Sequence, residues 1–158
     1  MYPLLVVAGL VFHHNKLLIT QRPPGKKHAG YWEFPGGKLE KDESPVNALV
    51  RELCEEIDLE VTQCEIFDVV YHSYDEQPVL LMVYRCQSDT SRVRHLEVSD
   101  HAWIDVEELH NYSMLPADDE LIEQVIKKKT RRNDFTLRRT FNICCSHQRL
   151  FQKLSAPS

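Results

Sequence analysis

Three glutamates close together in the chain concentrate negative charge at one place. Glu52, Glu55 and Glu56 belong to the stretch RELCEEIDLE, residues 51–60. In a helix, successive residues are about 100° apart, so the three carboxylates would share an arc of roughly 100°. Like charges four residues apart destabilise an exposed helix by a few tenths of a kcal/mol. A bound cation would offset this repulsion; without one, the carboxylates form a solvated acidic face.

A helix beginning after Ser44 would position these glutamates. Ser44 is a preferred N-cap residue, and Pro45 suits the first helical position because the missing N–H is not needed there. Apolar residues then recur with helical period on the side next to the glutamates: Val46, Leu49, Val50, Leu53, Cys54 and Ile57. The sequence therefore predicts an amphipathic helix with an acidic edge.

A longer spaced pattern contains the three glutamates. Six residues lie at fixed offsets from one another: Gly37, Glu43, Arg51, Glu52, Glu55 and Glu56. This pattern resembles the Nudix box of the Nudix hydrolases, and with residue frequencies of about 5–7% it would arise by chance on the order of once in ten million positions. One position departs from it, because Asp58 stands where the family usually has glycine. That position ends the helix, often in a left-handed conformation, which aspartate tolerates better than most residues.

The resemblance implies a metal site. Its ligands would be four residues: Glu52, Glu55, Glu56 and, through its backbone carbonyl, Gly37. Mg²⁺ prefers oxygen ligands and commonly binds carboxylates together with substrate phosphates, so we expect Mg²⁺, with Mn²⁺ as a substitute. The resemblance also implies that Glu43 and Arg51 join the loop to the helix through a salt bridge.

The resemblance extends over roughly residues 3–128. AGYWEFPGGKLE, ITQRP and LPADDEL are similar to the branch with the MutT-type 8-oxo-dGTP diphosphatases and the CTP pyrophosphohydrolases. It implies that Glu97, six residues before Trp103, binds metal and helps to activate water; otherwise Glu97 is a surface loop residue. It implies that Arg22 contacts the nucleotide and that Phe34 borders the base pocket. The alternatives are a surface arginine and an ordinary core residue.

Asp118 lies where relatives specific for 8-oxoguanine carry asparagine. An ionised aspartate only accepts hydrogen bonds, so it would favour a base edge that offers donors, such as the amine of cytosine or adenine. The adjacent Asp119 is an alternative, since either aspartate could face the base while the other caps the following helix. Both could also serve the helix N-terminus alone.

The activity that the resemblance implies is hydrolysis of the pyrophosphate linkage of nucleoside triphosphates, giving a monophosphate and pyrophosphate. Glu52, Glu55 and Glu97 are the candidates for the general base. Two other functions remain open: removal of pyrophosphate from RNA 5′ ends, and nucleotide sensing without catalysis. The intact set of carboxylates disfavours the second of these.

Strand and helix patterns alternate around the motif. Runs rich in β-branched and aromatic residues predict strands over residues 6–12, 16–22, 31–34, 65–74 and 77–87, followed by a strand and helical turn over 102–109. An amphipathic pattern predicts a closing helix over residues 117–129. This order predicts an α/β (α+β) fold in which a mixed β-sheet is sandwiched between helices, and the resemblance implies the Nudix fold.

The charge distribution separates an acidic body from a basic tail. Residues 1–126 carry 10 Lys and Arg against 23 Asp and Glu, whereas residues 127–158 carry 9 against one. We expect a Nudix domain over residues 1–130 and a basic tail over residues 131–158. The tail could contact a nucleic acid, but its spacing equally suits an amphipathic helix on the acidic body or a partly disordered end.

The remaining composition predicts an ordinary protein of a reducing cytoplasm. The five cysteines form an odd set without a Cys-x-x-Cys spacing, which argues against a disulfide framework and a zinc site. The apolar run at residues 4–12 is too short to span a bilayer, so we interpret it as a buried strand and expect no membrane partner. The expected partner is a small nucleotide.

Overall fold

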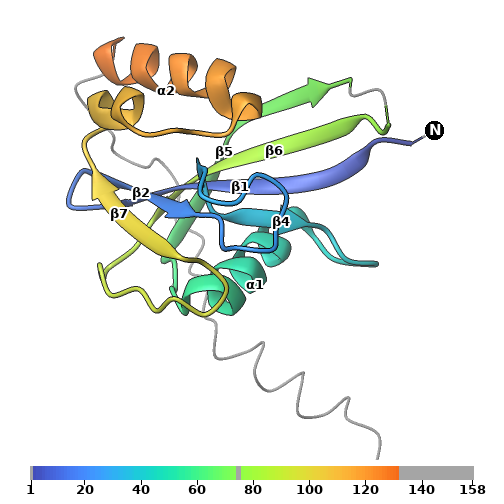
Figure 1. The fold of residues 1–158 in the computed structure, drawn as a ribbon, viewed down its shortest axis with the longest axis horizontal. Helices are drawn as coiled ribbons and strands as arrows, with labels where there is room; N and C mark the ends of the chain where they lie inside the picture. The colour runs from blue at the N-terminus through green and yellow to red at the C-terminus, as the bar shows by residue number, and fades with distance from the viewer. Residues whose placement is uncertain (1, 74–75, 132–158) are drawn as a thin grey trace, which may run out of the picture.

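A mixed β-sheet lies between two helices in the computed structural model (Figure 1), which describes residues 2–73 and 76–131. In chain order the elements are β1 (Leu4–His13), β2 (Lys16–Gln21), β3 (Trp32–Glu33), β4 (Gly36–Lys38), α1 (Pro45–Ile57), β5 (Gln63–His72), β6 (Val79–Gln87), β7 (Asp100–Ile104), the 3₁₀ helices η1 (Val106–Asn111) and η2 (Pro116–Asp118), and α2 (Asp119–Arg131). The predicted α+β sandwich is confirmed.

Strand β1 is the centre of the sheet. It pairs in parallel with β6 and antiparallel with β2 and β4, while β5 extends the sheet beyond β6 and both β3 and β7 pair with β2. The parallel β1 and β6 pair makes the sheet mixed, as predicted. The apolar run at residues 4–12 is thus a central strand, because its neighbours cover both of its edges.

Alternate residues of β1 face two separate cores. Leu10 and Phe12 pack in the cluster that includes Leu121 of α2, whereas Val7 and Val11 pack in the cluster that includes the apolar side of α1. Successive side chains of a strand point to opposite faces, so a strand covered on both faces is apolar throughout. One helix therefore covers each face of the sheet (Figure 1).

Helix α1 begins and ends at the residues that the sequence indicated. The Ser44 hydroxyl accepts a hydrogen bond from the Asn47 N–H, and Pro45 is the first helical residue. The helix ends at Asp58, which has a left-handed backbone with φ of 52°. Its N–H donates to the Cys54 carbonyl, so the expectation that aspartate adopts the conformation usual for glycine here is confirmed.

Strand β4 was not predicted from the sequence. Its residues, Gly36, Gly37 and Lys38, are poor strand formers, but β4 pairs with β1 because Gly36 allows close approach. A Cβ atom at Gly36 would lie 2.0 Å from the Val7 carbonyl oxygen. The tertiary contact, and not the local propensity, therefore makes this segment a strand.

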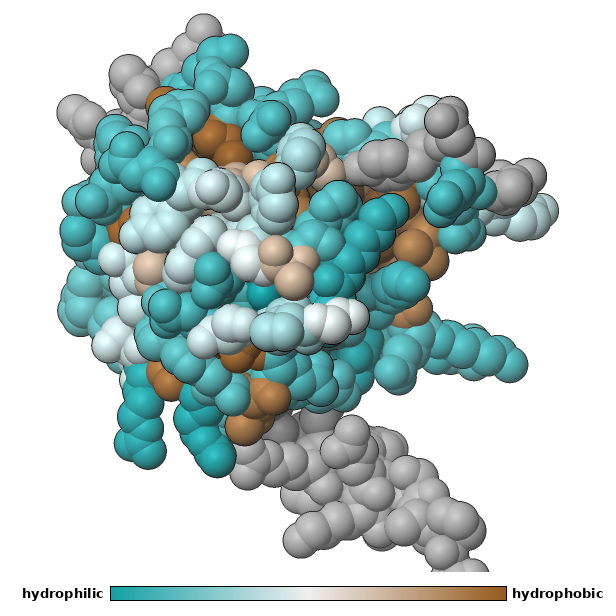
Figure 2. All heavy atoms as spheres, viewed as in Figure 1, coloured by the Kyte–Doolittle hydropathy of each residue, from teal (hydrophilic) through white to brown (hydrophobic). Residues whose placement is uncertain are grey.

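Hydrophilic residues cover most of the face seen in Figure 2, with small apolar patches between them. None of the helices in residues 2–73 and 76–131 combines the length and apolar character that a transmembrane span requires. The predicted basic tail lies outside the described residues, apart from Arg131 at the end of α2.

Candidate functional site

An open cleft of about 590 Å³ collects most of the candidate site residues. Those that line it are Arg22, Phe34, Gly37, Glu52, Glu56, Glu97 and Asp118. They come from the β2 to β4 region, α1, the segment before β7, and η2. The fold therefore brings together residues that are up to 96 positions apart in the sequence.

Gly37 and Glu52 are in close contact in this cleft. A Cβ atom at Gly37 would lie 2.3 Å from Glu52 Oε1, so no larger residue fits unless the carboxylate moves. The β4 backbone thus lies directly against a carboxylate of α1. Glycine is therefore the residue that lets the backbone of this loop approach the carboxylate so closely.

Glu97 reaches the cleft because its segment, residues 88–99, is attached to the end of α1. The N–H groups of Leu96 and Glu97 donate to the Glu56 carbonyl at 3.1 and 3.0 Å, and the Arg94 N–H donates to the Ile57 carbonyl at 2.9 Å. The last turn of a helix leaves carbonyls without intrahelical partners, and this segment supplies the donors. The same hydrogen bonds that complete α1 therefore bring a distant carboxylate to it.

The acidic side chains of the cleft repel one another. Burial, together with the charges of Glu52 and Glu33 and against the opposing charge of Lys26, raises the pKa of the Glu56 carboxyl to about 8. Burial also raises the pKa of Glu52, although a hydrogen bond from Arg51 opposes this. Glu56 is only 8% exposed, and no hydrogen bond to its carboxylate is found within the described residues. A buried carboxylate without a partner is costly, and a cation would stabilise it.

The donor set fits a divalent cation that prefers oxygen. The cleft is lined by the backbone of Gly37 and by three acidic residues, Glu52, Glu56 and Glu97. In the described part of the chain, these carboxylates do not all lie within 4.8 Å of one another. Opposite ligands of one octahedral Mg²⁺ lie about 4.2 Å apart, so a single ion would take at most two of these carboxylates as they are placed, and waters and substrate phosphates would complete its octahedron.

Arg51 joins the loop to the helix. Its Nε and Nη2 atoms donate to the two carboxylate oxygens of Glu43 at 2.8 and 3.0 Å, and Nη2 also donates to the Lys38 carbonyl at 3.0 Å. Its Nη1 donates to Glu52 at 3.0 Å and to Glu55 at 3.1 Å. Arg51 thus orients the loop and Glu52 together, because the guanidinium offers several donors in a fixed plane.

Glu55 lies apart from the other glutamates. Its side chain is 44% exposed and bonds to Arg51, and it does not line the cleft. Glu56, one residue later, is buried in the cleft. Metal binding by Glu55 stays a prediction, whereas the geometry brings Glu52, Glu56 and Glu97 to the same cavity.

Apolar and acidic residues form the rest of the cleft. Phe34, Leu81 and Leu115 line it together with Asp118, which is 8% exposed. Burial raises the pKa of Asp118 to about 7, with the charges of Glu33 and Asp119 acting in the same direction and Arg22 opposing. Both protonation states are therefore accessible near neutral pH, and the protonated form can donate as well as accept.

The two aspartates occupy different places. Asp118 faces the cleft, whereas Asp119 is exposed at the start of α2 and lines another cavity with Tyr31 and Leu109. Asp118 thus lines the cleft and Asp119 lies at the N-terminus of α2, and contact of Asp118 with the base stays a prediction.

Three further cleft residues were not singled out in the sequence. Glu33, Lys26 and Lys38 all line the cleft. Glu33 accepts a hydrogen bond from Arg22 at 2.7 Å, so Arg22 lies in the wall of the cleft as part of an ion pair. The alternation of Glu33 with its apolar neighbours could have indicated it, but nothing in the local pattern distinguishes Lys26 from the adjacent lysine.

Known proteins share this arrangement of elements. Residues 3–125 match the NUDIX domain family. The chain is 34% identical over 127 residues to the CTP pyrophosphohydrolase of Escherichia coli (strain K12), which covers 80% of this chain and 94% of that enzyme. It is 45% identical over 80 residues to an 8-oxo-dGTP diphosphatase of Proteus vulgaris, which covers 50% of this chain and 71% of that enzyme.

A solved structure agrees with these relatives. The solution structure of the E. coli ORF135 protein is 33% identical, covers 84% of this chain and 94% of its own, and has a TM-score of 0.74. Because the family match includes the Nudix box on α1 and the cleft that it lines, this chain belongs to the NUDIX family of hydrolases.

Proposed function

We propose that this protein hydrolyses nucleoside triphosphates to the monophosphate and pyrophosphate in the presence of Mg²⁺, with Mn²⁺ as a substitute. The observation that carries the proposal is the single cleft in which Gly37, Glu52, Glu56 and Glu97 meet Phe34 and Asp118. A site with acidic oxygens and an apolar wall suits a ligand that is polyanionic at one end and a base at the other. The activities of the named relatives support the same substrate class.

One or more Mg²⁺ ions would be held by Glu52, Glu56, Glu97 and the Gly37 carbonyl, with one or two carboxylates on each ion. When bound, a divalent ion neutralises phosphate charge and makes water more acidic. Glu52 and Glu97 are the cleft residues suited to accept the proton of the attacking water. Water adds to phosphorus, the bond from phosphorus to the bridging oxygen breaks, and that oxygen leaves with the pyrophosphate or the monophosphate.

Two lysines are suited to contact the phosphates. Lys26 and Lys38 line the same cleft as the acidic groups, and Lys26 is close enough to lower the pKa of Glu56. Positioning and charge neutralisation supply most of the catalysis in phosphoryl displacements. These lysines would therefore complement the metal in a cleft that is otherwise strongly acidic.

Asp118 would recognise the base of the nucleotide through hydrogen bonds. Ionised, it accepts a hydrogen bond from an exocyclic amine such as that of cytosine; protonated, it can also donate to a carbonyl, as an asparagine amide does. A pKa of about 7 makes both forms available near neutrality. We therefore infer that cytosine nucleotides and oxidised guanine nucleotides are both candidate substrates, the first favoured at higher pH.

The test is release of pyrophosphate from a panel of substrates with Mg²⁺ or Mn²⁺. CTP, dCTP, dGTP, 8-oxo-dGTP and RNA with a 5′-triphosphate separate the candidates. We expect Glu52→Gln to reduce turnover about 10²-fold to 10⁴-fold. Glu60→Gln, at an exposed position after α1, is the matched control and should retain full activity.

Each outcome of the panel has a defined meaning. Preference for the RNA substrate over all free nucleotides would replace the proposal with an RNA 5′-end hydrolase. Absence of turnover on every substrate with either metal would leave a nucleotide sensor. Turnover that Glu52→Gln leaves unchanged would show that the acidic cleft is not the active site.

The cytoplasm is the compartment in which we expect this activity.

A further inference from the structure

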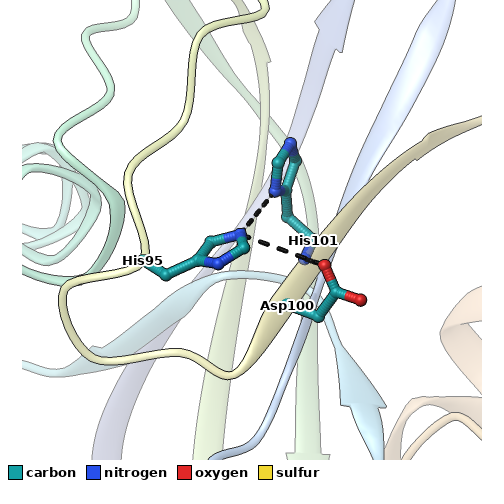
Figure 3. Close-up of side chains that lie close together, drawn as sticks. All are labelled: His95, Asp100 and His101. Carbon is teal, nitrogen blue, oxygen red and sulfur yellow. Dashed lines mark hydrogen bonds and ion pairs between the residues drawn. The ribbon is translucent and has the colours of Figure 1, made fainter.

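Two histidines and an aspartate form a cluster outside the cleft. His95 belongs to the segment before β7, and Asp100 and His101 are the first two residues of β7. Figure 3 shows both imidazole rings and the carboxylate turned toward one another. His95 Nε2 lies 2.7 Å from His101 Nδ1 and 4.0 Å from Asp100 Oδ1. None of the three residues lines the cleft.

We propose that His95, Asp100 and His101 form a binding site for a transition-metal ion such as Zn²⁺ or Co²⁺. Imidazole nitrogens suit these ions, whereas Mg²⁺ prefers an all-oxygen set. One ligand atom from each residue lies within 4.8 Å of the other two, and within the described residues no other group of three His, Cys, Asp or Glu meets this criterion. The site is therefore chemically distinct from the acidic cleft.

Small movements of the three side chains would bring their ligand atoms to the distances that metal coordination requires. Zn–N bonds of about 2.0–2.1 Å at tetrahedral angles put two ligand nitrogens about 3.3 Å apart. The His95 and His101 nitrogens, at 2.7 Å, need to separate by about 0.6 Å, and the Asp100 oxygen needs to approach by a similar amount. Rotations of the side chains are sufficient, because those of His95 and Asp100 are 39% and 58% exposed.

Hydrogen bonds already hold the three side chains together. In the hydrogen-bonded pair one nitrogen carries the proton that the other accepts, and an ion would replace that proton. Asp100 is held in place by the His101 N–H, which donates to its Oδ1 at 2.8 Å.

An ion at this site would restrain the segment that carries Glu97. His95 is two residues before Glu97, and the intervening Leu96 donates to the Glu56 carbonyl. Coordination would join His95 to β7 and so close a short loop between two fixed points. The expected consequence is slower hydrogen exchange at the amides of Leu96 and Glu97 when the ion binds.

Binding is tested by titrating Co²⁺ into the full chain in a large excess of Mg²⁺, which occupies the oxygen ligands of the cleft. We expect His95→Gln and His101→Gln to bind one Co²⁺ fewer than the wild type, or to bind that ion at least about tenfold more weakly. His110→Gln, an exposed histidine in η1, is the matched control and should bind as the wild type does.

A second measurement needs no variant. Co²⁺ broadens nearby amide resonances, and we expect the broadening to centre on residues 95–101 in the wild type. Equal Co²⁺ binding by His95→Gln and the wild type, or broadening centred elsewhere, would overturn the site. Hydrogen exchange at the Glu97 amide that stays unchanged when the ion binds would contradict the expectation that the ion restrains this segment. The outcome does not depend on whether the cleft hydrolyses nucleotides.

Discussion

At the scale of single residues, burial decides what each carboxyl can do. Glu55 and Glu56 are neighbours in the same helix, yet Glu55 is solvated and bonds to Arg51, whereas Glu56 is buried among other acids. Asp118 and Asp119 differ in the same way. Identical side chains thus acquire different surroundings, and burial among other acids raises the pKa of Glu56 and of Asp118 because it destabilises the charged form.

The first prediction concerns the pH dependence that Asp118 gives to folding. The pKa of Asp118 is about 7 in the folded protein and ordinarily 3.8. Its contribution to the free energy of unfolding is therefore fully present below pH 3.8 and is lost as the pH rises to about 7. An asparagine side chain at this position would not titrate. Relative to Asp118→Asn, the wild type should therefore lose up to about 4 kcal/mol of unfolding free energy across this range.

The measurement is urea unfolding of both proteins from pH 4 to pH 8. Glu120→Gln, which changes an exposed carboxylate in the first turn of α2, should follow the wild type. A constant difference between the wild type and Asp118→Asn would contradict the raised pKa of Asp118.

At the scale of elements, α1 carries the site because its middle and its C-terminal end are joined to other segments. Arg51 connects its middle to the loop through Glu43 and the Lys38 carbonyl. The left-handed Asp58 ends the helix, and the segment before β7 binds its last carbonyls. Each connection fixes a carboxylate of the cleft, so the helix acts as a rigid support for the site.

The second prediction is that Arg51→Lys destabilises the protein although the charge is kept. Lysine cannot reproduce the two parallel hydrogen bonds to Glu43, and it leaves the Lys38 carbonyl without a donor from this side chain. We expect a loss of about 2–3 kcal/mol in urea unfolding. Arg94→Lys, at a largely exposed ion pair with Asp58, should cost well under about 1 kcal/mol. Equal effects of the two substitutions would contradict this role of Arg51.

The third prediction concerns the end of the helix. Glycine adopts a φ of 52° without the steric cost that a side chain brings, so Asp58→Gly should be neutral or stabilise the protein by up to about 1 kcal/mol. Asp58→Ala should destabilise it by about 1 kcal/mol, since alanine has the steric cost and no polar side chain. Thermal unfolding of the two variants checks the order. An alanine variant as stable as the glycine variant would contradict the left-handed conformation.

At the scale of the whole molecule, an acidic body meets a polyanionic ligand. The 23 Asp and Glu of residues 1–126 exceed their 10 Lys and Arg, and several of the acids converge on one cleft. Such a body repels free triphosphate unless cations intervene. Substrate binding and metal binding should therefore be strongly coupled, with each strengthening the other.

The fourth prediction is that Mg²⁺ stabilises the folded protein. At a hundredfold excess over its dissociation constant, one bound ion adds about 2.7 kcal/mol, which raises the Tm by about 5–10 °C. The double variant with Glu52→Gln and Glu56→Gln should lose this response and, without Mg²⁺, be no less stable than the wild type. Calorimetry with Mg²⁺ and with EDTA tests both. A response that persists in the double variant would place the ion elsewhere.

The sequence by itself determined α1 and the spacing of the box, because these depend on local geometry. Ser44, Pro45 and the apolar period fix the helix, and 3.6 residues per turn bring Glu52 and Glu56 to one face. The central strands and the mixed sheet could also be predicted from the sequence, since runs rich in β-branched and aromatic residues between turns favour strands.

Tertiary structure alone decided which residues complete the site. The arrival of Glu97 at α1, the placement of Asp118 in the cleft, and the approach of His95 to β7 all depend on where chain reversals bring distant segments together. Strand β4 formed against its own propensity for the same reason. Contacts within one helical turn follow from the backbone period, whereas contacts across the sheet follow from how its elements pack, which no local pattern encodes.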